Sequence, residues 1–283
     1  MMNESSIRDF QAYLSVAIGV FLVICLAAPV AAEARSSVVP GRDAIEDLEL
    51  TGDFLFELDG ADLTDAEIYV SKRHVAYLVV TPGLPAPLLI SPRGNSVQSV
   101  QQEKLARVDG GATLAADSVA QYIGEYDLRG GKMIFDLAGK TAKLKPKPPL
   151  LGRQTFDALE THDPKYAYNA RAYQAKAAAA TAPPIPGENL RIRVYFGSWS
   201  EICKLLVPKM QQVEDDWKTH GVRFEYYGVP RPIIDDPHAV EMGIVGVPTA
   251  VVFVGDEEVG RLTGRALDTP EESLYRLLEG GRQ

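Results

Sequence analysis

Residues 190–203 read LRIRVYFGSWSEIC, and this stretch decides the fold of the C-terminal third of the chain. Its first half, Leu190–Phe196, predicts a strand, because it is a short apolar run that ends at a glycine. Gly197–Ser200 predicts a tight loop, and a helix is expected to begin at Glu201. Unpaired N–H groups and the positive end of the helix dipole stabilise a thiolate at such a terminus. The stretch therefore predicts a strand, a loop and a helix N-terminus that carries the thiol of Cys203.

The elements that follow complete a small α/β domain. The first helix is expected to end near His220, and a second strand covers Val222–Tyr227. Two more strands are expected at Thr249–Phe253 and Val259–Leu262, on either side of a turn. A final helix follows Asp268, which is expected to cap it. The order is therefore strand, helix, strand, strand, strand, helix.

This order resembles the thioredoxin family. The match rests on Trp199 opening the loop, Cys203 in the second cysteine position, Pro208 five residues later, the segment Gly246–Thr249 before an apolar strand, and Gly264. The resemblance implies a central mixed sheet flanked by helices. It also implies a cis peptide bond before Pro248, facing the active-site loop.

Two departures from the family pattern bear on function. In the family's Cys-x-x-Cys motif the first cysteine attacks a substrate disulfide and the second resolves the mixed disulfide, but here Ser200 stands in the first position. A serine hydroxyl does not ionise near neutral pH, so dithiol exchange within one chain is excluded. Many thioredoxins also carry a buried carboxylate five residues before the loop tryptophan, where this chain has Val194. The resemblance thus implies a relative of thiol-disulfide oxidoreductases that lacks the dithiol pair, and whether it is an enzyme stays open.

Cys203 and Ser200 are the candidate catalytic residues, and each has two interpretations. Cys203 is either a reactive thiol that forms mixed disulfides with a partner, or a buried residue that packs as a small hydrophobe. In the first case it is available to a bound partner, or it acts as a monothiol oxidoreductase that an external thiol resolves. Ser200 is either what remains of the active site or simply a helix N-cap. A redox-inactive interaction module is the alternative to both redox functions.

The resemblance also suggests where a partner binds. The expected binding residues are Trp199, Glu201, Ile202, Val247 and Pro248. The backbone beside a cis-proline can pair with an extended segment as an added strand, which gives affinity without chemistry. Trp199 either lines this groove or only covers the loop. We therefore expect a protein or peptide partner.

The N-terminus predicts export. Residues 11–32 contain no charge, Pro29 interrupts the apolar run, and small residues follow at Ala31 and Ala32. Residues 1–34 are accordingly a cleaved signal peptide or an uncleaved membrane anchor. Either way the folded part is expected outside the cytoplasm, periplasmic or extracellular, with membrane contact only through this segment. If it is cleaved, Cys25 is lost with it.

Composition excludes several classes of protein. Hydrophobic residues make up 46% of the chain and charged residues 24%, as in ordinary globular proteins, and the net charge is −9. An acidic chain without a basic stripe is not expected to bind nucleic acid. The histidines are scattered, and no pair has metal-ligand spacing on one element; they are His74, His162, His220 and His238. We predict no metal and no cofactor.

The region before the α/β domain predicts a second domain. Short strands separated by glycine turns across residues 40–150 predict an all-β domain, an antiparallel sandwich or barrel. The expected strands are Glu67–Ser71, Val75–Val80, Leu88–Ile90, Tyr122–Leu128, Met133–Leu137 and Thr141–Lys145. Residues 151–187 predict a helix at Tyr166–Ala180, free to pack on either domain, and a Pro/Ala-rich linker. Residues 188–283 are the thioredoxin-like domain.

Overall fold

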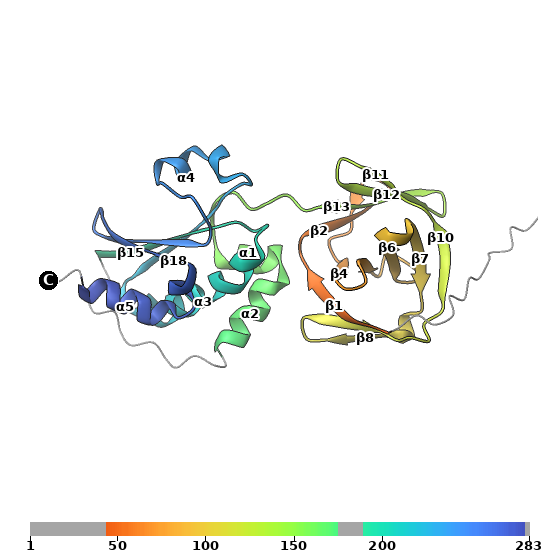
Figure 1. Cartoon of the computed structure of the whole chain (residues 1–283), viewed down its shortest axis with the longest axis horizontal. Helices are drawn as coiled ribbons and strands as arrows, with labels where there is room; N and C mark the ends of the chain where they lie inside the picture. Colours follow the sequence, from red (N-terminus) through yellow and green to blue (C-terminus); the bar gives the residue numbers. More distant parts are fainter. Residues whose placement is uncertain (1–43, 175–188, 281–283) are drawn as a thin grey trace, which may run out of the picture. The chain divides into compact units, whose positions relative to one another are not determined.

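The structure is a computed structural model that describes residues 44–174 and 189–280. The predicted signal peptide or anchor at 1–34 and the Pro/Ala-rich part of the linker lie outside these residues. The described part contains an all-antiparallel β region followed by an α/β region with a mixed sheet (Figure 1). Its helices include none long and apolar enough to cross a membrane.

The β region consists of two antiparallel sheets. Its strands are β1 (Ile45–Thr51), β2 (Phe54–Leu58), β3 (Ala61–Asp62), β4 (Glu67–Ser71), β5 (Ala76–Val80), β6 (Leu88–Ser91), β7 (Ser96–Val100), β8 (Leu105–Val108), β9 (Gly111–Leu114), β10 (Ala120–Gly124), β11 (Asp127–Arg129), β12 (Lys132–Leu137) and β13 (Lys140–Pro146). An 8-stranded sheet runs β10-β7-β6-β5-β4-β1-β9-β8, and a 5-stranded sheet runs β11-β12-β13-β2-β3.

The larger sheet buries apolar side chains on both faces. Along β5, Leu78 and Val80 belong to one hydrophobic cluster. The other side chains of this cluster come from the same sheet. Val79 between them belongs to another, shared with Phe56 and Leu144 of the smaller sheet. The 8-stranded sheet therefore encloses one core and packs against the 5-stranded sheet through a second.

The sequence predicted this antiparallel architecture, and the structure confirms it. The expected strand Glu67–Ser71 is β4, and the expected strand Thr141–Lys145 lies within β13. The expected strand Tyr122–Leu128 is divided between β10 and β11, which belong to different sheets. The sequence did not predict β1, β2, β3, β7, β8 or β9.

The α/β region is built on a 5-stranded mixed sheet. Its elements are β14 (Gly152–Gln154), α1 (Phe156–His162), α2 (Pro164–Gln174), β15 (Leu190–Phe196), α3 (Glu201–Trp217), β16 (Arg223–Gly228), α4 (Pro237–Glu241), β17 (Thr249–Val254), β18 (Glu257–Thr263) and α5 (Pro270–Gly280). The strand order is β14-β16-β15-β17-β18. Strands β15 and β16 are parallel, and the other pairs are antiparallel. The peptide bonds before Pro232 and Pro248 are cis, and only the second was expected.

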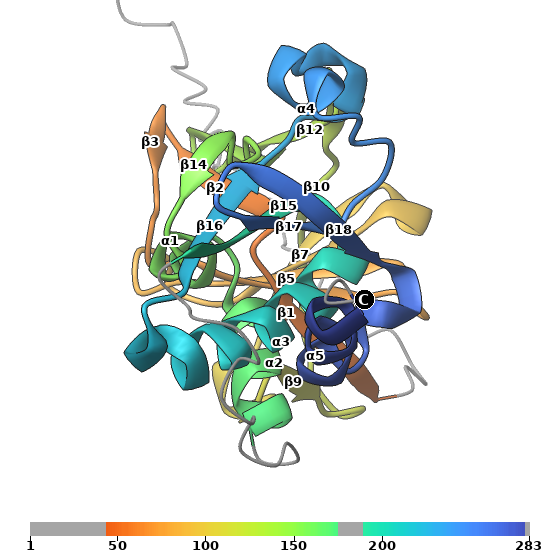
Figure 2. The same ribbon diagram turned by 90° about the vertical axis from the view of Figure 1, so that its left-hand side faces the viewer.

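The helices divide unequally between the two faces of this sheet. Alternate residues of β15, such as Ile192 and Val194, lie in one hydrophobic cluster with residues of α1, α2, α3 and α5. Tyr195 of the same strand lies in another cluster, with Ala239 of α4. Figures 1 and 2 show the same division, with α4 on one side of the sheet and the longer helices on the other. The sequence did not indicate where the helix at Tyr166 packs. In the structure this helix, α2, packs against α3.

Candidate functional site

The loop between β15 and α3 folds its tryptophan back over its glycine. A Cβ atom at Gly197 would lie 2.5 Å from Cε2 of Trp199, so only glycine allows this position of the ring. Trp199 donates a hydrogen bond through Nε1 to the carbonyl of Val229 at 3.0 Å. The guanidinium of Arg231 lies over the ring, 5.3 Å from its centroid. The Trp199 side chain is thus tied to the segment after β16.

The proline segment lies at the same end of the sheet as this loop. Tyr195 of β15 pairs with Thr249 of β17. Gly197 and Pro248, which continue these two adjacent strands, therefore lie at the same end of the sheet. The Pro248 side chain is buried, and Val247 is partly buried against both clusters of the domain. The register therefore brings together the two segments that the resemblance assigned to a binding groove.

Ser200 is the N-cap of α3. Its hydroxyl accepts a hydrogen bond from the backbone N–H of Cys203 at 3.4 Å, and its backbone is extended, as a capping residue requires. The side chain is 9% exposed. The serine therefore has a structural role in the position that the resemblance would give to an attacking cysteine.

Cys203 is fully buried. Its side chain is 0% exposed, and its Sγ accepts a hydrogen bond from the N–H of Gly197 at 3.4 Å. Burial raises the pKa of the thiol above its ordinary value, although the hydrogen bonds from Ser200 and Gly197 and the charge of Lys204 oppose this. The thiol is therefore protonated at neutral pH and out of contact with solvent.

The next residue, Lys204, is a buried cation that the sequence analysis missed. Its side chain is 1% exposed, and its Nζ lies 2.8 Å from Oδ2 of Asp163, which is itself 0% exposed. Burial would lower the pKa of this lysine, but the charge of Asp163 and hydrogen bonds to carboxylates raise it overall. Nothing in the sequence indicated that the carboxylate of Asp163 faces α3.

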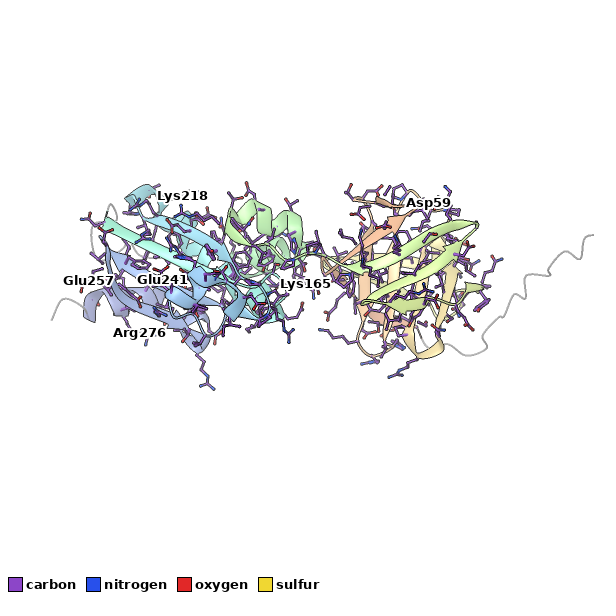
Figure 3. All side chains as sticks on the ribbon, turned by 90° about the horizontal axis from the view of Figure 1, so that it is seen from above. Asp59, Lys165, Lys218, Glu241, Glu257 and Arg276 are labelled. Atoms are coloured by element: carbon purple, nitrogen blue, oxygen red, sulfur yellow. The ribbon has the colours of Figure 1, made fainter. Side chains whose placement is uncertain are left out.

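Glu201 completes this charged cluster at the surface. Lys204 donates to it at 2.9 Å and Lys165 of α2 at 2.8 Å; Lys165 is labelled in Figure 3. Burial alone would raise the pKa of Glu201, but these two lysines bring it down to about 2. Glu201 is therefore held by neighbouring side chains in the structure, whereas the sequence analysis proposed it as a binding residue.

Tyr166 of α2 adds a buried hydroxyl beside the thiol. Its side chain is 0% exposed, and its hydroxyl has no hydrogen-bond partner among the described residues. Burial raises the pKa of Tyr166, and the negative charges of an ionised Cys203 and of Asp163 raise it further. Like Lys204, this residue gave no signal in the sequence.

Two exposed apolar residues lie on the segments that form the site. Ile202, in the first turn of α3, is 48% exposed, and Val245, three residues before the cis-proline Pro248, is 97% exposed. Ile202 was among the expected binding residues and Val245 was not. Within the described ranges, no cluster of three His, Cys, Asp or Glu side chains is placed to hold a metal.

Comparisons with known proteins identify no family for this chain. No protein-family model matches it, and no curated protein does. Thioredoxin 1 from Thermosipho africanus is 20% identical over 33% of this chain and 99% of that one, with a TM-score of 0.26. A protein of unknown function from Pseudomonas aeruginosa is 11% identical over 42% of this chain and 80% of that one, with a TM-score of 0.27. At such low TM-scores neither match carries an argument about function, and the first suggests a thioredoxin-like fold at most.

Proposed function

We propose that this chain is an exported thioredoxin-family protein that binds an extended segment of a partner protein without disulfide exchange. Export is inferred from the uncharged run at residues 11–32, and the family from the motif around Trp199 and Pro248. The binding site is at the end of the sheet where the loop after β15 and the segment Val245–Pro248 lie on neighbouring strands. Its mode is strand addition beside the cis-proline, with apolar side chains filling the contact.

The burial of Cys203 carries this proposal. Thiol-disulfide exchange requires a thiolate that reaches the disulfide of the partner. The side chain of Cys203 has no exposed surface, and burial raises the pKa of its thiol. Ser200, in the more accessible position, cannot perform the exchange. A binding role agrees with both observations, whereas a redox role requires the N-terminus of α3 to open.

The exposed apolar residues support binding at this edge. Val245 is 97% exposed, although valine is usually buried. Ile202 presents a second apolar side chain from the start of α3. A partner that covers both would remove apolar surface from water, the main favourable term in association.

A second candidate function is a mixed disulfide between Cys203 and a partner. The N–H of Gly197, the hydroxyl of Ser200 and the charge of Lys204 all favour the thiolate. These groups give the thiolate a stabilised site once the loop opens. This is the monothiol interpretation, and the experiment below distinguishes it from simple binding.

The test selects peptides from a random display library against the purified chain and measures their affinity by fluorescence anisotropy. Val245→Asp and Ile202→Asp should each weaken binding by about tenfold, because each buries a charge in an apolar contact. Leu128→Asp is the matched control, since Leu128 is exposed on β11 of the other region. Unchanged affinity in both site variants would refute the proposed surface.

Cys203→Ser separates the two candidates. Binding without chemistry predicts the same affinity in this variant under reducing and oxidising conditions. A partner captured only under oxidising conditions, and lost in Cys203→Ser, would establish the mixed disulfide instead.

A further inference from the structure

We propose that the sheet face on the α4 side of the α/β region is a second interaction surface, and that it binds an acidic peptide segment of a partner protein. This surface is separate from the edge at Pro248, so the inference does not rest on the function proposed above. In the described part of the chain, α4 is the only α-helix on this face (Figures 1 and 2). Helix α4 contains 5 residues; with the segments beside it, it covers Tyr195 and Val251 but leaves Arg153 and Arg223 exposed.

The strand register places arginines side by side on this face. Residues paired directly across neighbouring strands point to the same side of a sheet. Arg191 pairs with Arg223 of β16, and Arg193 pairs with Glu225. Across β17, Val251 is opposite both Arg193 and Arg261. We name this group, with Arg153 of β14, the arginine face; its members are Arg153, Arg191, Arg193, Arg223 and Arg261.

Carboxylates neutralise only part of this charge. Glu225 receives a hydrogen bond from Nε of Arg193 at 2.6 Å and lies 3.9 Å from Nη1 of Arg191. Arg261 is paired with Glu258. Arg153 and Arg223 are exposed and form no ion pair with any residue that the structure describes. Asp236 also contacts Tyr227 on this face, so the five arginines meet three carboxylates, those of Asp236, Glu225 and Glu258. The face therefore keeps an excess of positive charge in a chain whose net charge is −9.

Two of these arginines, Arg191 and Arg193, are held in place rather than free in solvent. Arg193 is 8% exposed, and its Nη1 lies 3.0 Å from Nε2 of His238. The guanidinium of Arg191 lies over the ring of Phe253, 4.1 Å from the centroid. Pre-ordered guanidinium groups lose little entropy when they bind a carboxylate. Arginine beside aromatic rings is also the composition typical of interface hot spots.

The chemistry favours carboxylates over a phosphate backbone. The face already holds the carboxylate of Glu225 between two guanidinium groups. The net negative charge of the chain repels a long polyanion, whereas a short acidic segment contacts only the local positive region. Tyr227, which is partly exposed, offers apolar surface to the side chains between the acidic ones. An extended segment that alternates acidic and apolar residues fits these features.

The test uses the purified full chain and a fluorescein-labelled peptide of alternating glutamate and valine. We expect binding by fluorescence anisotropy, weaker as salt is raised from about 0.05 M to about 0.5 M. The double variant Arg153→Glu/Arg223→Glu should weaken binding by about tenfold or more. Arg276→Glu is the matched control, because Arg276 is an exposed arginine on α5, across the sheet (Figure 3).

Further measurements keep the outcome unambiguous. If the double variant does not fold, Arg153→Gln/Arg223→Gln replaces it and should still lower the affinity. Equal affinity in the double variant and the wild type would overturn the proposal. So would equal binding of a glutamine–valine peptide. Tighter binding of heparin, lost in the same variants, would mean that the face recognises polyanions instead of acidic peptides.

Discussion

Asn169 of α2 donates a hydrogen bond from Nδ2 to the backbone carbonyl of Lys204 in α3, at 2.9 Å. In a regular helix this carbonyl would accept from the N–H four residues later. That residue is Pro208, which lies inside α3 and has no N–H. The side chain of one helix therefore supplies the donor that the proline removes from the other.

This relationship predicts a coupled mutational effect. Asn169→Ala should lower the free energy of unfolding by about 1–2 kcal/mol, because the carbonyl is left without a partner. In a Pro208→Ala background the new N–H satisfies the carbonyl, so Asn169→Ala should cost clearly less. Urea denaturation of the four proteins in the cycle measures the coupling. Gln174→Ala, at the exposed end of α2, is the control, and equal costs in both backgrounds would contradict the assignment.

The sequence predicted much of the fold because periodicity is a local signal. Leu190–Phe196 was expected as a strand and is β15, and the N-cap role considered for Ser200 is confirmed. The packing of Asn169 against α3 had no local signal, since it depends on two helices far apart in the chain. Strand β1 was missed because charged residues interrupt its apolar ones, as at Glu46 and Asp47.

Cys203 should react slowly in the folded protein. Alkylation by iodoacetamide at neutral pH should be at least about tenfold slower than in urea, because the thiol is buried and its pKa is raised. The unfolded thiol ionises first as pH rises. The stabilisation from the buried neutral thiol is therefore present below the ordinary thiol pKa and is lost above it. Rapid alkylation of the native protein would instead favour the mixed-disulfide candidate.

Ser200→Cys should create an internal disulfide. The new side chain would occupy the N-cap of α3, where the hydroxyl now contacts the N–H of Cys203. Mild oxidation followed by mass spectrometry should find a bridge between the two thiols. Reductase activity should stay well below that of an ordinary thioredoxin, because Val194 cannot accept a proton. Ser200→Ala is the control, and absence of a bridge in the cysteine variant would refute the geometry assigned to this loop.

Because of His162, the free energy of unfolding should decrease in weak acid. Burial, with the charge of Lys147, lowers the pKa of His162 from 6.5 to about 4. The unfolded chain then binds a proton that the folded chain does not, so stability is full above pH 6.5 and declines as the pH approaches 4. The side chain is partly exposed, so the expected loss by pH 5 is about 1–2 kcal/mol.

Urea denaturation between pH 7.5 and 5 checks this decline. His162→Gln should flatten it, because glutamine does not titrate. His220→Gln, at an exposed histidine, should leave it unchanged. The same slope in wild type and His162→Gln would assign the acid sensitivity to other groups.

The sequence motif predicted some residues of the candidate site and not others. Trp199, Ser200, Cys203 and Pro248 lie on adjacent segments as expected, because the resemblance fixed their positions relative to the strands. The burial of Lys204 and Tyr166 depends instead on α2, which the sequence analysis did not place. From the sequence alone, a lysine in the first turn of a helix is expected to be exposed. Lys204 is buried because another helix covers it.

The alternation along β15 also limits which changes this strand tolerates. Ile192 and Val194 face the longer helices, while Arg191 and Arg193 lie on the arginine face. Inserting or deleting one residue would exchange the two sets from that point on, forcing guanidinium groups under α3 and aliphatic side chains into water. Length variation should therefore be excluded from the middle of β15 and tolerated in the turn at Gly255, between β17 and β18.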